Sequence, residues 1–460
     1  MSIHAVILAA GKGTRMRSRS PKVLQRIGGR PMLGHVLDTA ATAGVSVCHV
    51  VLGHEAERVR EWLATAAPNA QSVDAVVQEP QLGTAHAVQQ ALPEIPDEAL
   101  VVVLYGDVPL VPAATIRALA AATGDGLAIV TARPADPTGY GRILRDDAGL
   151  VLGVVEEREA STAQRALGEV NTGLLAAPAR RLRGWLQRVR NDNAKGEFYL
   201  TDVVALAVAD GVTVTTFEAA DAELMEGVND ARQLASAERR CQLQQARALM
   251  AKGVRLADPA RFDLRGSLQC GQDVEIDVGC VFEGHVELGD GVSIGPYCVL
   301  RDVHVAAGAR IRSHSVLEQA ELGAGCQVGP FSRLRPGARL EAEVHVGNFV
   351  EIKNSHLGVG TKAGHLAYVG DADVGARVNV SAGVITCNYD GANKHRTRVG
   401  DDAFIGTDTQ LVAPVEVGAG AFVAAGSTIA RNVPAGGLSI CRAREQKHFP
   451  DWKRPVKTRK

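Results

Sequence analysis

The sequence has no long uninterrupted hydrophobic run, although 46% of its 460 residues are hydrophobic. No stretch reaches the roughly 20 apolar residues that a membrane-spanning helix needs. The apolar start, Ile3 to Ala10, also lacks the charged leader and the cleavage site of a secretory signal. These absences argue against membrane insertion, and we expect the protein to be cytoplasmic.

An excess of charge of one sign is also missing. The 50 Lys and Arg residues nearly balance the 51 Asp and Glu residues, which gives a net charge of −1 and no field that would attract nucleic acid. The eight cysteines are scattered and form no C-x-x-C pair, so neither a zinc site nor a disulfide framework is indicated. What remains is an ordinary globular composition, with length enough for two to four domains.

A six-residue repeat dominates the second half of the chain. Every sixth position from Ile276 to Ile429, with four one-residue slips, returns to a small aliphatic residue that is often followed by Gly. Such a unit is one short strand plus a corner, and stacked coils bury the aliphatic residues that no single coil could bury. The repeat therefore predicts a parallel β-helix.

One larger interruption breaks this repeat. Between Thr386 and Arg398, the polar segment TCNYDGANKHRTR replaces two of the six-residue units. Insertions in solenoid proteins gather on one side, so the segment predicts a loop over a binding face, with a passive loop as the alternative. Cys387 in this loop is either a reactive thiol or a bystander.

The first half shows a different pattern, in which short apolar strands alternate with amphipathic helices. The predicted strands are Ala5 to Leu8, Val47 to Leu52, Val101 to Leu104 and Ala128 to Thr131. The predicted helices are Met32 to Ala43, Ala56 to Ala67 and Ala85 to Leu92. This alternation predicts a mainly parallel sheet whose ligands lie beyond the carboxyl ends of the strands. A polar helix from Asp230 to Lys252, closed by Gly253, then links the halves.

The first strand runs directly into a glycine-rich turn, LAAGKGTRM at 8–16. Gly11 and Gly13 let the backbone approach a polyanion closely, while Lys12 and Arg15 add positive charge. The Walker spacing is absent, and the dinucleotide fingerprint lacks its third Gly at Met16. The turn therefore predicts a phosphate site of another kind, with a plain tight turn as the alternative.

The motif L-x-x-G-x-G-T-R-M, followed by Pro21 and Lys22, resembles that of nucleotidyltransferases that make sugar nucleotides. With the six-residue repeat attached, nearly the whole chain is similar to the bacterial bifunctional N-acetylglucosamine-1-phosphate uridyltransferase/glucosamine-1-phosphate acetyltransferase family. This resemblance implies a Rossmann-like α/β uridyltransferase domain at 1–228, a linker helix at 229–252 and a left-handed β-helix acetyltransferase domain with a C-terminal tail at 253–460. It also implies a homotrimer assembled through the β-helix.

The resemblance further implies a UTP site in the first half. Arg15 and Lys22 are expected on the phosphates as catalytic cations. Two residues are expected to hold Mg²⁺, which takes few oxygen ligands from protein: Asp107, just past a buried strand, and Asn229. Without the motif around it, Asp107 would be interpreted as a turn-capping residue. The other residues implied for UTP and UDP-N-acetylglucosamine are Leu8, Ala9, Ala10, Gly11, Gln78, Gly83, Thr84, Tyr105, Gly106, Gly141, Glu156 and Asn171.

In the β-helix, the resemblance makes His365 the catalytic base. Acetyl transfer needs a proton removed from the glucosamine amine, and imidazoles ionise near neutral pH. The residues implied for glucosamine 1-phosphate are Arg335, Lys353, Tyr368 and Asn379. The residues implied for acetyl-CoA are Ala382, Asn388, Tyr389, Thr407, Ala425 and Arg442.

Three functions remain open at this point. The first is a two-activity enzyme that acetylates glucosamine 1-phosphate with acetyl-CoA and then transfers uridylyl from UTP, for envelope synthesis. The second is a single-activity pyrophosphorylase with a structural or regulatory β-helix, which would not need His365. The third is a non-enzymatic scaffold, against which the retention of Lys22, Asp107 and Asn229 speaks.

Overall fold

The structure is a computed structural model that describes residues 2–66 and 72–442. The chain divides into two compact units, Met1–Glu238 and Arg239–Lys460, and the boundary falls inside helix α8 (Ala231–Ala251). The domain limits 1–228, 229–252 and 253–460 stay a prediction, and the tail 443–460 lies outside the described residues. Among the described residues, no helix is long and apolar enough to cross a membrane.

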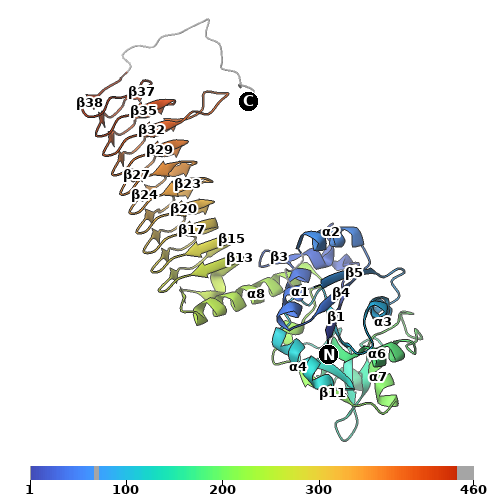
Figure 1. Cartoon of the computed structure of the whole chain (residues 1–460). Helices are drawn as coiled ribbons and strands as arrows, with labels where there is room; N and C mark the ends of the chain where they lie inside the picture. The colour runs from blue at the N-terminus through green and yellow to red at the C-terminus, as the bar shows by residue number, and fades with distance from the viewer. Residues whose placement is uncertain (1, 67–71, 443–460) are drawn as a thin grey trace. The chain divides into compact units, whose positions relative to one another are not determined.

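A nine-stranded sheet forms the centre of the first unit (Figure 1). Its strands are β11 (Val214–Glu218), β7 (Leu127–Ala132), β10 (Val170–Pro178), β6 (Leu100–Tyr105), β1 (Ile3–Leu8), β4 (Val47–Leu52) and β5 (Ser72–Val77) in spatial order, with β8 (Arg142–Arg145) and β9 (Val151–Val155) attached beside β10. β1 pairs in parallel with β4 and β6, which confirms the predicted sheet. β10 runs antiparallel between β6 and β7, a feature that the sequence does not predict.

Helices cover both faces of this sheet because successive strand residues point to opposite faces. They are α1 (Met32–Thr42), α2 (Ala56–Ala66), α3 (Thr84–Ala91), α4 (Ala113–Thr123), α6 (Ala179–Leu186) and α7 (Asp202–Ala209). The short α5 (Thr162–Arg165) has no buried residue. Ile7 belongs to the core formed with α1, α2 and α4, whereas Val6 belongs to the core formed with α3, α6 and α7. The three predicted helices correspond to α1, α2 and α3, although Ala67 lies outside the described residues.

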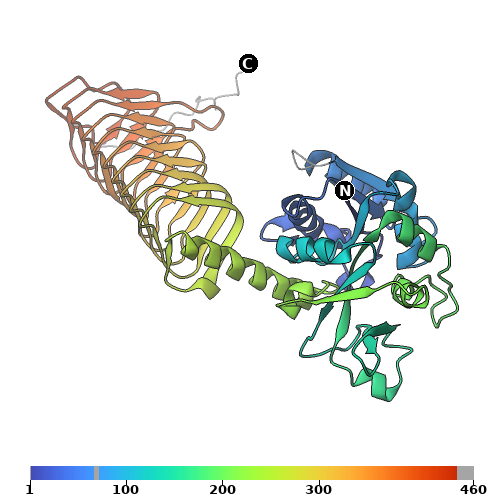
Figure 2. The same cartoon turned by 60° about the horizontal axis from the view of Figure 1, so that its bottom comes forward.

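The second unit is a column of coils, most of which place a strand on each of three faces (Figure 2). Face one holds β12 (Arg255–Leu256), β14 (Glu275–Ile276), β16 (Ser293–Ile294), β18 (Arg310–Ile311), β21 (Gln327–Val328), β24 (His345–Asn348), β27 (Lys362–His365), β30 (Asn379–Val380), β33 (Phe404–Ile405), β36 (Phe422–Val423) and β38 (Leu438–Ser439). Face two holds β19 (Val316–Glu318), β22 (Arg333–Leu334), β25 (Glu351–Lys353), β28 (Tyr368–Gly370), β31 (Ile385–Cys387), β34 (Gln410–Val412) and β37 (Thr428–Ile429).

Face three completes the prism. It holds β20 (Ala320–Leu322), β23 (Ala338–Leu340), β26 (His356–Leu357), β29 (Ala372–Val374), β32 (Thr397–Val399) and β35 (Val415–Val417). The long strands of the first coils are β13 (Phe262–Cys270), β15 (Cys280–Leu288) and β17 (Val299–Val305). β17 pairs in parallel with both β19 and β20, so it runs across the corner between faces two and three. These parallel pairings confirm the predicted β-helix.

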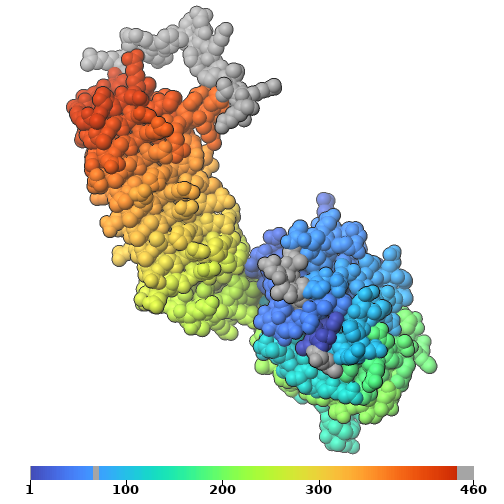
Figure 3. Space-filling view, in the orientation of Figure 1, coloured from blue at the N-terminus to red at the C-terminus, as the bar shows by residue number. Residues whose placement is uncertain are grey.

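The repeated aliphatic positions point into this column. In one coil, Val346, Ile352 and Leu357 come from the three faces, and each is fully buried. Each further coil adds another such layer, which is how a solenoid obtains a continuous core. Figure 3 shows the side chains of successive coils in contact along the yellow-to-red part of the chain.

Helix α8 covers the open end of the first coil. Ala246 and Leu249 from its C-terminal half join the core of the β-helix. The side chain of Gln242 forms two hydrogen bonds with the backbone of Leu264, at 2.7 and 2.9 Å. Gly253 follows the helix with a φ of 95°, the left-handed conformation expected of a closing glycine. The helix therefore caps a core that would otherwise be exposed to water.

The predicted loop leaves the column between β31 and β32 (Figure 1). Thr386 takes the place of an aliphatic residue and is buried, and its hydroxyl accepts a hydrogen bond from the Gly370 N–H at 2.7 Å. Residues 388–396 then leave at the corner between faces two and three, before β32 resumes the coil. The presence of a loop is confirmed, and its role over a binding face stays a prediction.

Two histidines are buried on adjacent strands of the first unit, His4 on β1 and His49 on β4. His4 Nδ1 lies 3.0 Å from His49 Nε2, and His49 Nδ1 lies 3.6 Å from the Asp74 carboxylate. Burial lowers the pKa of both imidazoles, and this effect outweighs the opposing influence of Asp74. The unfolded chain therefore binds more protons at these positions than the folded protein does as the pH falls below about 6.5.

We expect the free energy of unfolding of the first unit to decrease as the pH is lowered below about 6.5, by up to about 1.4 kcal/mol per pH unit for each histidine. Urea unfolding followed by the fluorescence of Trp185, which is buried in this unit, measures the slope. The double variant His4→Phe/His49→Phe serves as the control and should show a shallower slope. Equal slopes in the two proteins would contradict this expectation.

Candidate functional site

The glycine-rich turn lies at the carboxyl edge of the sheet in the first unit. β1 ends at Leu8 and β6 at Tyr105, and the Gly106 N–H donates to the Leu8 carbonyl at 3.0 Å. Gly13 has a left-handed backbone with a φ of 57°, and a Cβ at this position would lie 2.7 Å from the Cβ of Lys22. The turn therefore requires glycine at position 13, because the stem of Lys22 lies against it.

Three residues that are far apart in the sequence converge beside this turn. The Lys22 ammonium forms an ion pair with Asp107 and donates to Asn229 Oδ1 at 2.7 Å. The side chains of Lys22 and Asp107 are only 11% and 22% exposed. Asn229 is held in turn by Gln233, whose Oε1 accepts the Asn229 backbone N–H at 2.8 Å. Two oxygens from separate segments are thereby aimed at one cationic group.

The position between Asp107 and Asn229 suits a divalent cation, because a cation, the Lys22 ammonium, already contacts both oxygens. Mg²⁺ commonly takes one or two protein oxygens and completes its shell with waters and phosphate oxygens. Within the described part of the chain, no cluster of three or more His, Cys, Asp or Glu side chains suits a metal ion. A metal at this edge would therefore depend on Asp107, Asn229 and the phosphates of a ligand.

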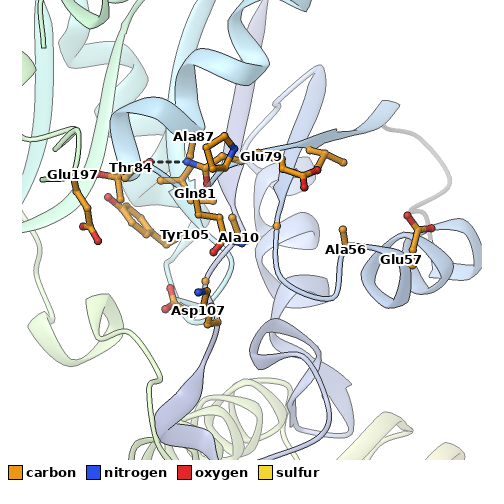
Figure 4. A pocket seen from close by; sticks show the side chains of 18 residues that line it. Ala10, Ala56, Glu57, Glu79, Gln81, Thr84, Ala87, Tyr105, Asp107 and Glu197 are labelled. Atoms are coloured by element: carbon orange, nitrogen blue, oxygen red, sulfur yellow. Dashed lines mark hydrogen bonds between the residues drawn. The ribbon is translucent and has the colours of Figure 1, made fainter. Parts of the chain in front are cut away.

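A pocket of about 1020 Å³ opens beside Asp107 (Figure 4). Gln78 in its wall is buried and donates from Nε2 to the Gly83 carbonyl at 2.9 Å. A Cβ at Gly83 would lie 2.5 Å from the Phe198 carbonyl oxygen, so only glycine fits there. The predicted residues that line this pocket are Leu8, Ala10, Gly11, Gln78, Gly83, Thr84, Tyr105 and Asp107.

A second pocket of about 700 Å³ shares Thr84 and Tyr105 with the first. In its wall, the Glu156 carboxylate accepts a hydrogen bond from the Thr201 hydroxyl at 2.9 Å. Burial raises the pKa of Tyr105, and the charges of Asp107 and Glu156 raise it further, so its hydroxyl stays a neutral donor. The predicted residues that line this pocket are Arg15, Thr84, Tyr105, Gly141, Glu156 and Asn171.

Four predicted residues of the first unit line neither pocket. Lys22 pairs with Asp107, and Asn229 accepts a hydrogen bond from the Lys22 ammonium. Ala9 is buried, with 4% of its surface exposed. Gly106 lies against the core, where a Cβ would meet Val23 at 3.1 Å. Ala9 and Gly106 therefore shape the edge of the sheet through their backbones.

The segment 195–201 lines the pockets although the sequence analysis does not single it out. Glu197 borders both pockets, and Lys195, Tyr199 and Thr201 border the second. Its backbone is tied to the Gly83 turn, since the Leu200 N–H donates to the Thr84 hydroxyl at 3.0 Å. The sequence feature that could have indicated this segment is a short polar and aromatic run, KGEFYLT, immediately before a helix.

In the β-helix, His365 ends strand β27 on face one. Its Nδ1 lies 3.0 Å from Oδ1 of Asn348, the residue paired with it on β24. Because an amide oxygen only accepts hydrogen bonds, this contact places a proton on Nδ1, so in the neutral ring the lone pair is on Nε2. Asn379 begins β30 on the same face and donates to the Ser381 hydroxyl at 2.9 Å. Asn348 is a candidate site residue that was not predicted from the sequence.

Cationic side chains gather on face two. Arg335 donates to the Glu351 carboxylate at 2.8 Å, and Lys353 ends the neighbouring strand β25. Lys394, from the 388–396 loop, lies beside Lys353, and this contact between two ammonium groups lowers the pKa of Lys394. Because the two charges repel each other, an anion between them would be stabilised. Lys394 was not predicted from the sequence, because its proximity to Lys353 depends on the loop conformation.

The 388–396 loop is held against face two by polar contacts. Asn388 donates from Nδ2 to the Tyr368 hydroxyl at 3.4 Å and also to the Asp371 carboxylate. Within the loop, Asp390 accepts the Asn393 N–H at 2.7 Å, and this bond, with others from the loop, lowers the pKa of Asp390 to about 2. These contacts give the loop a defined conformation beside the cationic side chains.

Four of the predicted acetyl-CoA residues lie on successive coils at the corner between faces one and two. They are Ala382, Thr407, Ala425 and Arg442. Arg442 donates from Nε and Nη2 to the Ala425 carbonyl at 3.0 and 2.8 Å. Asn388 and Tyr389 lie on the loop at the opposite edge of face two. Within a single chain, the predicted acetyl-CoA residues therefore form two groups, one at each edge of face two.

Family models match both units. A MobA-like NTP transferase domain matches residues 5–195, and the bacterial transferase hexapeptide (six repeats) matches residues 268–302 and 396–431. The first match covers the turn, Asp107 and most of the lining of both pockets, but it ends at Lys195, before Glu197, Tyr199 and Thr201. The second falls on the coils of the β-helix. The order of the two matches is the order of the two folds along the chain.

Relatives that share both halves are similar along their whole length. Bifunctional protein GlmU of Methylibium petroleiphilum is 58% identical over 461 residues, which cover 99% of this chain and 100% of the relative. The proteins of the same name from Alkalilimnicola ehrlichii and Bordetella parapertussis are each 56% identical, over 454 and 459 residues, which cover 99% of this chain and 97% and 99% of those relatives. On this identity and coverage, the chain belongs to the family of bifunctional GlmU proteins.

Proposed function

We propose that the chain makes UDP-N-acetylglucosamine in two steps, one in each half. It is a bifunctional transferase, a glucosamine-1-phosphate acetyltransferase and an N-acetylglucosamine-1-phosphate uridyltransferase, and its product feeds the precursors of peptidoglycan and lipopolysaccharide. The observation that carries this proposal is the convergence of Lys22, Asp107 and Asn229 beside a phosphate-binding turn. We place the enzyme in the cytoplasm, where UTP and acetyl-CoA are available.

Uridylyl transfer would proceed by in-line attack of the sugar phosphate on the α-phosphorus of UTP, with pyrophosphate leaving. A phosphate nucleophile is already ionised, so positioning and charge stabilisation suffice and no general base is required. Lys22 and Arg15 would bind phosphate oxygens alongside the N–H groups of the turn. Asp107 and Asn229 would hold Mg²⁺, which when bound neutralises charge on the phosphates.

The two adjoining pockets suit the two ends of UDP-N-acetylglucosamine. Gln78, Gly83 and Thr84 would bind the nucleotide end in the larger pocket. Gly141, Glu156 and Asn171 would bind the sugar in the smaller one, where polar groups at fixed positions select among hydroxyl patterns. Their shared wall at Tyr105 lies next to Asp107, so the reacting phosphates would lie between the pockets and close to the metal ligands.

Acetyl transfer would use His365 as the general base. The lone pair of Nε2 would take a proton from the glucosamine amine as the nitrogen attacks the thioester carbonyl of acetyl-CoA. The carbon–sulfur bond would then break, and coenzyme A would leave as a thiol after its thiolate is protonated. Asn348 would hold the ring in this tautomer through its contact with Nδ1. Arg335, Lys353 and Lys394 would bind the phosphate of the sugar, which removes the repulsion between the two lysines.

We also propose that the β-helix forms a homotrimer. A line of exposed rings runs along the corner between faces one and two, with centroid distances of 5.2, 4.8 and 5.6 Å between successive rings of Tyr297, His314, Phe331 and Phe349. Phe349 is 57% exposed, and Leu366 on the next coil is 62% exposed. Contiguous exposed apolar surface of this kind favours a protein interface. A neighbouring copy here would lie beside His365 and could complete its site.

The two activities should be separable by single substitutions. Asp107→Asn should abolish release of pyrophosphate from UTP and leave acetylation intact, because it removes the one negative charge of the proposed ligand pair without touching the β-helix. His365→Ala should slow acetylation by about 10²- to 10⁴-fold and leave uridylyl transfer from UTP to N-acetylglucosamine 1-phosphate intact. Pyrophosphate and coenzyme A are measured in parallel on folded proteins. Loss of both activities in either variant would refute the division into two sites.

We expect Asn348 to affect acetyl transfer by fixing the tautomer of His365. Asn348→Ala should lower kcat for acetyl transfer by about ten- to a hundredfold with little change in KM, because the ring loses its fixed orientation but the substrate contacts remain. Asn348→Asp keeps an acceptor for Nδ1 and should retain most of the activity. Equal losses in the two variants, or a change in KM alone, would contradict this role.

The proposed trimer depends on the exposed corner. Phe349→Glu should convert the trimer to smaller species and reduce acetyl transfer, while uridylyl transfer persists, because a charge would be buried at the interface. Val359→Glu changes a residue that is 44% exposed at another corner and serves as the control. Light scattering after size exclusion gives the mass of each species. A monomeric wild-type protein with full acetyl transfer would rule out the need for a trimer.

A further inference from the structure

The Lys22 ammonium uses the same oxygens that are proposed to hold the metal. It pairs with Asp107 Oδ2 and donates to Asn229 Oδ1, and both partners belong to the proposed ligand pair. Its side chain is only 11% exposed, so water competes weakly for the ammonium. In this structure, Lys22 therefore lies where it neutralises the proposed metal ligands. Its proposed catalytic role, by contrast, is to bind the phosphates.

The ammonium and a divalent metal ion cannot occupy this position together. An ammonium nitrogen that lies 2.7 Å from Asn229 Oδ1 fills the space in which a metal ion would contact the same oxygen. A Mg²⁺ ion needs oxygen contacts of about 2.1 Å, and two cations at such separation repel strongly where water is scarce. Entry of the metal thus requires that the lysine leave Asp107 and Asn229.

The turn to which the ammonium would move lies directly against the stem of the lysine. The stem passes Gly13 in the phosphate-binding turn, where even a Cβ would collide with it. A lysine side chain has four rotatable carbons, and its charge can move from a carboxylate to a nearby phosphate. A triphosphate on this turn would offer the ammonium new partners as it leaves the metal ligands.

We propose that Lys22 is a tethered competitor of the metal, which neutralises Asp107 and Asn229 in the resting enzyme and is displaced onto the triphosphate when metal and UTP bind. The proposal rests on the metal ligands named under the proposed function and adds a consequence. The metal binds weakly to the enzyme without nucleotide and tightly with UTP, because UTP draws the competitor away.

Titration of the full-length chain with Mn²⁺ in the absence of nucleotide, followed by electron paramagnetic resonance of the free ion, tests this proposal. Lys22→Met has a side chain of similar length without the charge, and it should bind Mn²⁺ about tenfold or more tightly than the wild type. Lys22→Gln should behave in the same way. Lys12→Met removes one positive charge from the exposed part of the same turn, and its Mn²⁺ affinity should change by less than about threefold.

Two outcomes would overturn the proposal, and they are distinguishable. If Lys22→Met binds Mn²⁺ no more tightly than Lys12→Met does, the lysine is not a competitor, and the proposed metal ligands are unaffected. The double variant Lys22→Met/Asp107→Asn should lose the gain in affinity. If it binds as tightly as Lys22→Met alone, the metal does not use Asp107, and the metal site of the proposed function is wrong.

Discussion

The contact of Lys22 with Asp107 and Asn229 holds together the resting arrangement of the proposed uridyltransferase site. It joins residues that are 85 and 207 positions apart in the sequence, so local structure cannot produce it. The parallel pairing of β1 with β6, which sets Leu8 beside Tyr105, brings the glycine-rich turn and Asp107 to one edge. A shift of that register by one residue would turn the strand side chains to the other face and separate the turn from its acidic partner.

In the β-helix, the repeated coils bring the candidate site residues together. Residues that meet on its surface are about one coil apart in sequence, as His365 and Asn348 are, at 17 positions. Because the inward positions are filled by the aliphatic core, only the outward positions, the corners and the inserted loop are free to carry chemistry. The coils therefore form a rigid surface. The inserted loop places Lys394 beside that surface, and the six-residue repeat does not encode this position.

The sequence predicted the features that depend on short-range periodicity. The six-residue repeat predicted the parallel β-helix because each buried position recurs at a fixed spacing, and the alternation of strands and helices predicted the sheet. Antiparallel β10, the contact of Asn348 with His365 and the proximity of Lys394 to Lys353 depend on which strands and loops become neighbours, and no local pattern encodes that. The family resemblance, rather than periodicity, gave Asp107 and Asn229 a common role, and their shared contact with Lys22 is consistent with it.

Acetylation and uridylyl transfer are proposed here as separate reactions that take place in a fixed order. The most direct test is one assay of the purified enzyme with glucosamine 1-phosphate, acetyl-CoA, UTP and Mg²⁺, in which each component is omitted in turn and coenzyme A and pyrophosphate are measured together. We expect that omission of UTP abolishes the release of pyrophosphate but not of coenzyme A, and that omission of acetyl-CoA abolishes both. Release of coenzyme A that requires UTP, or undiminished release of pyrophosphate without acetyl-CoA, would contradict this expectation.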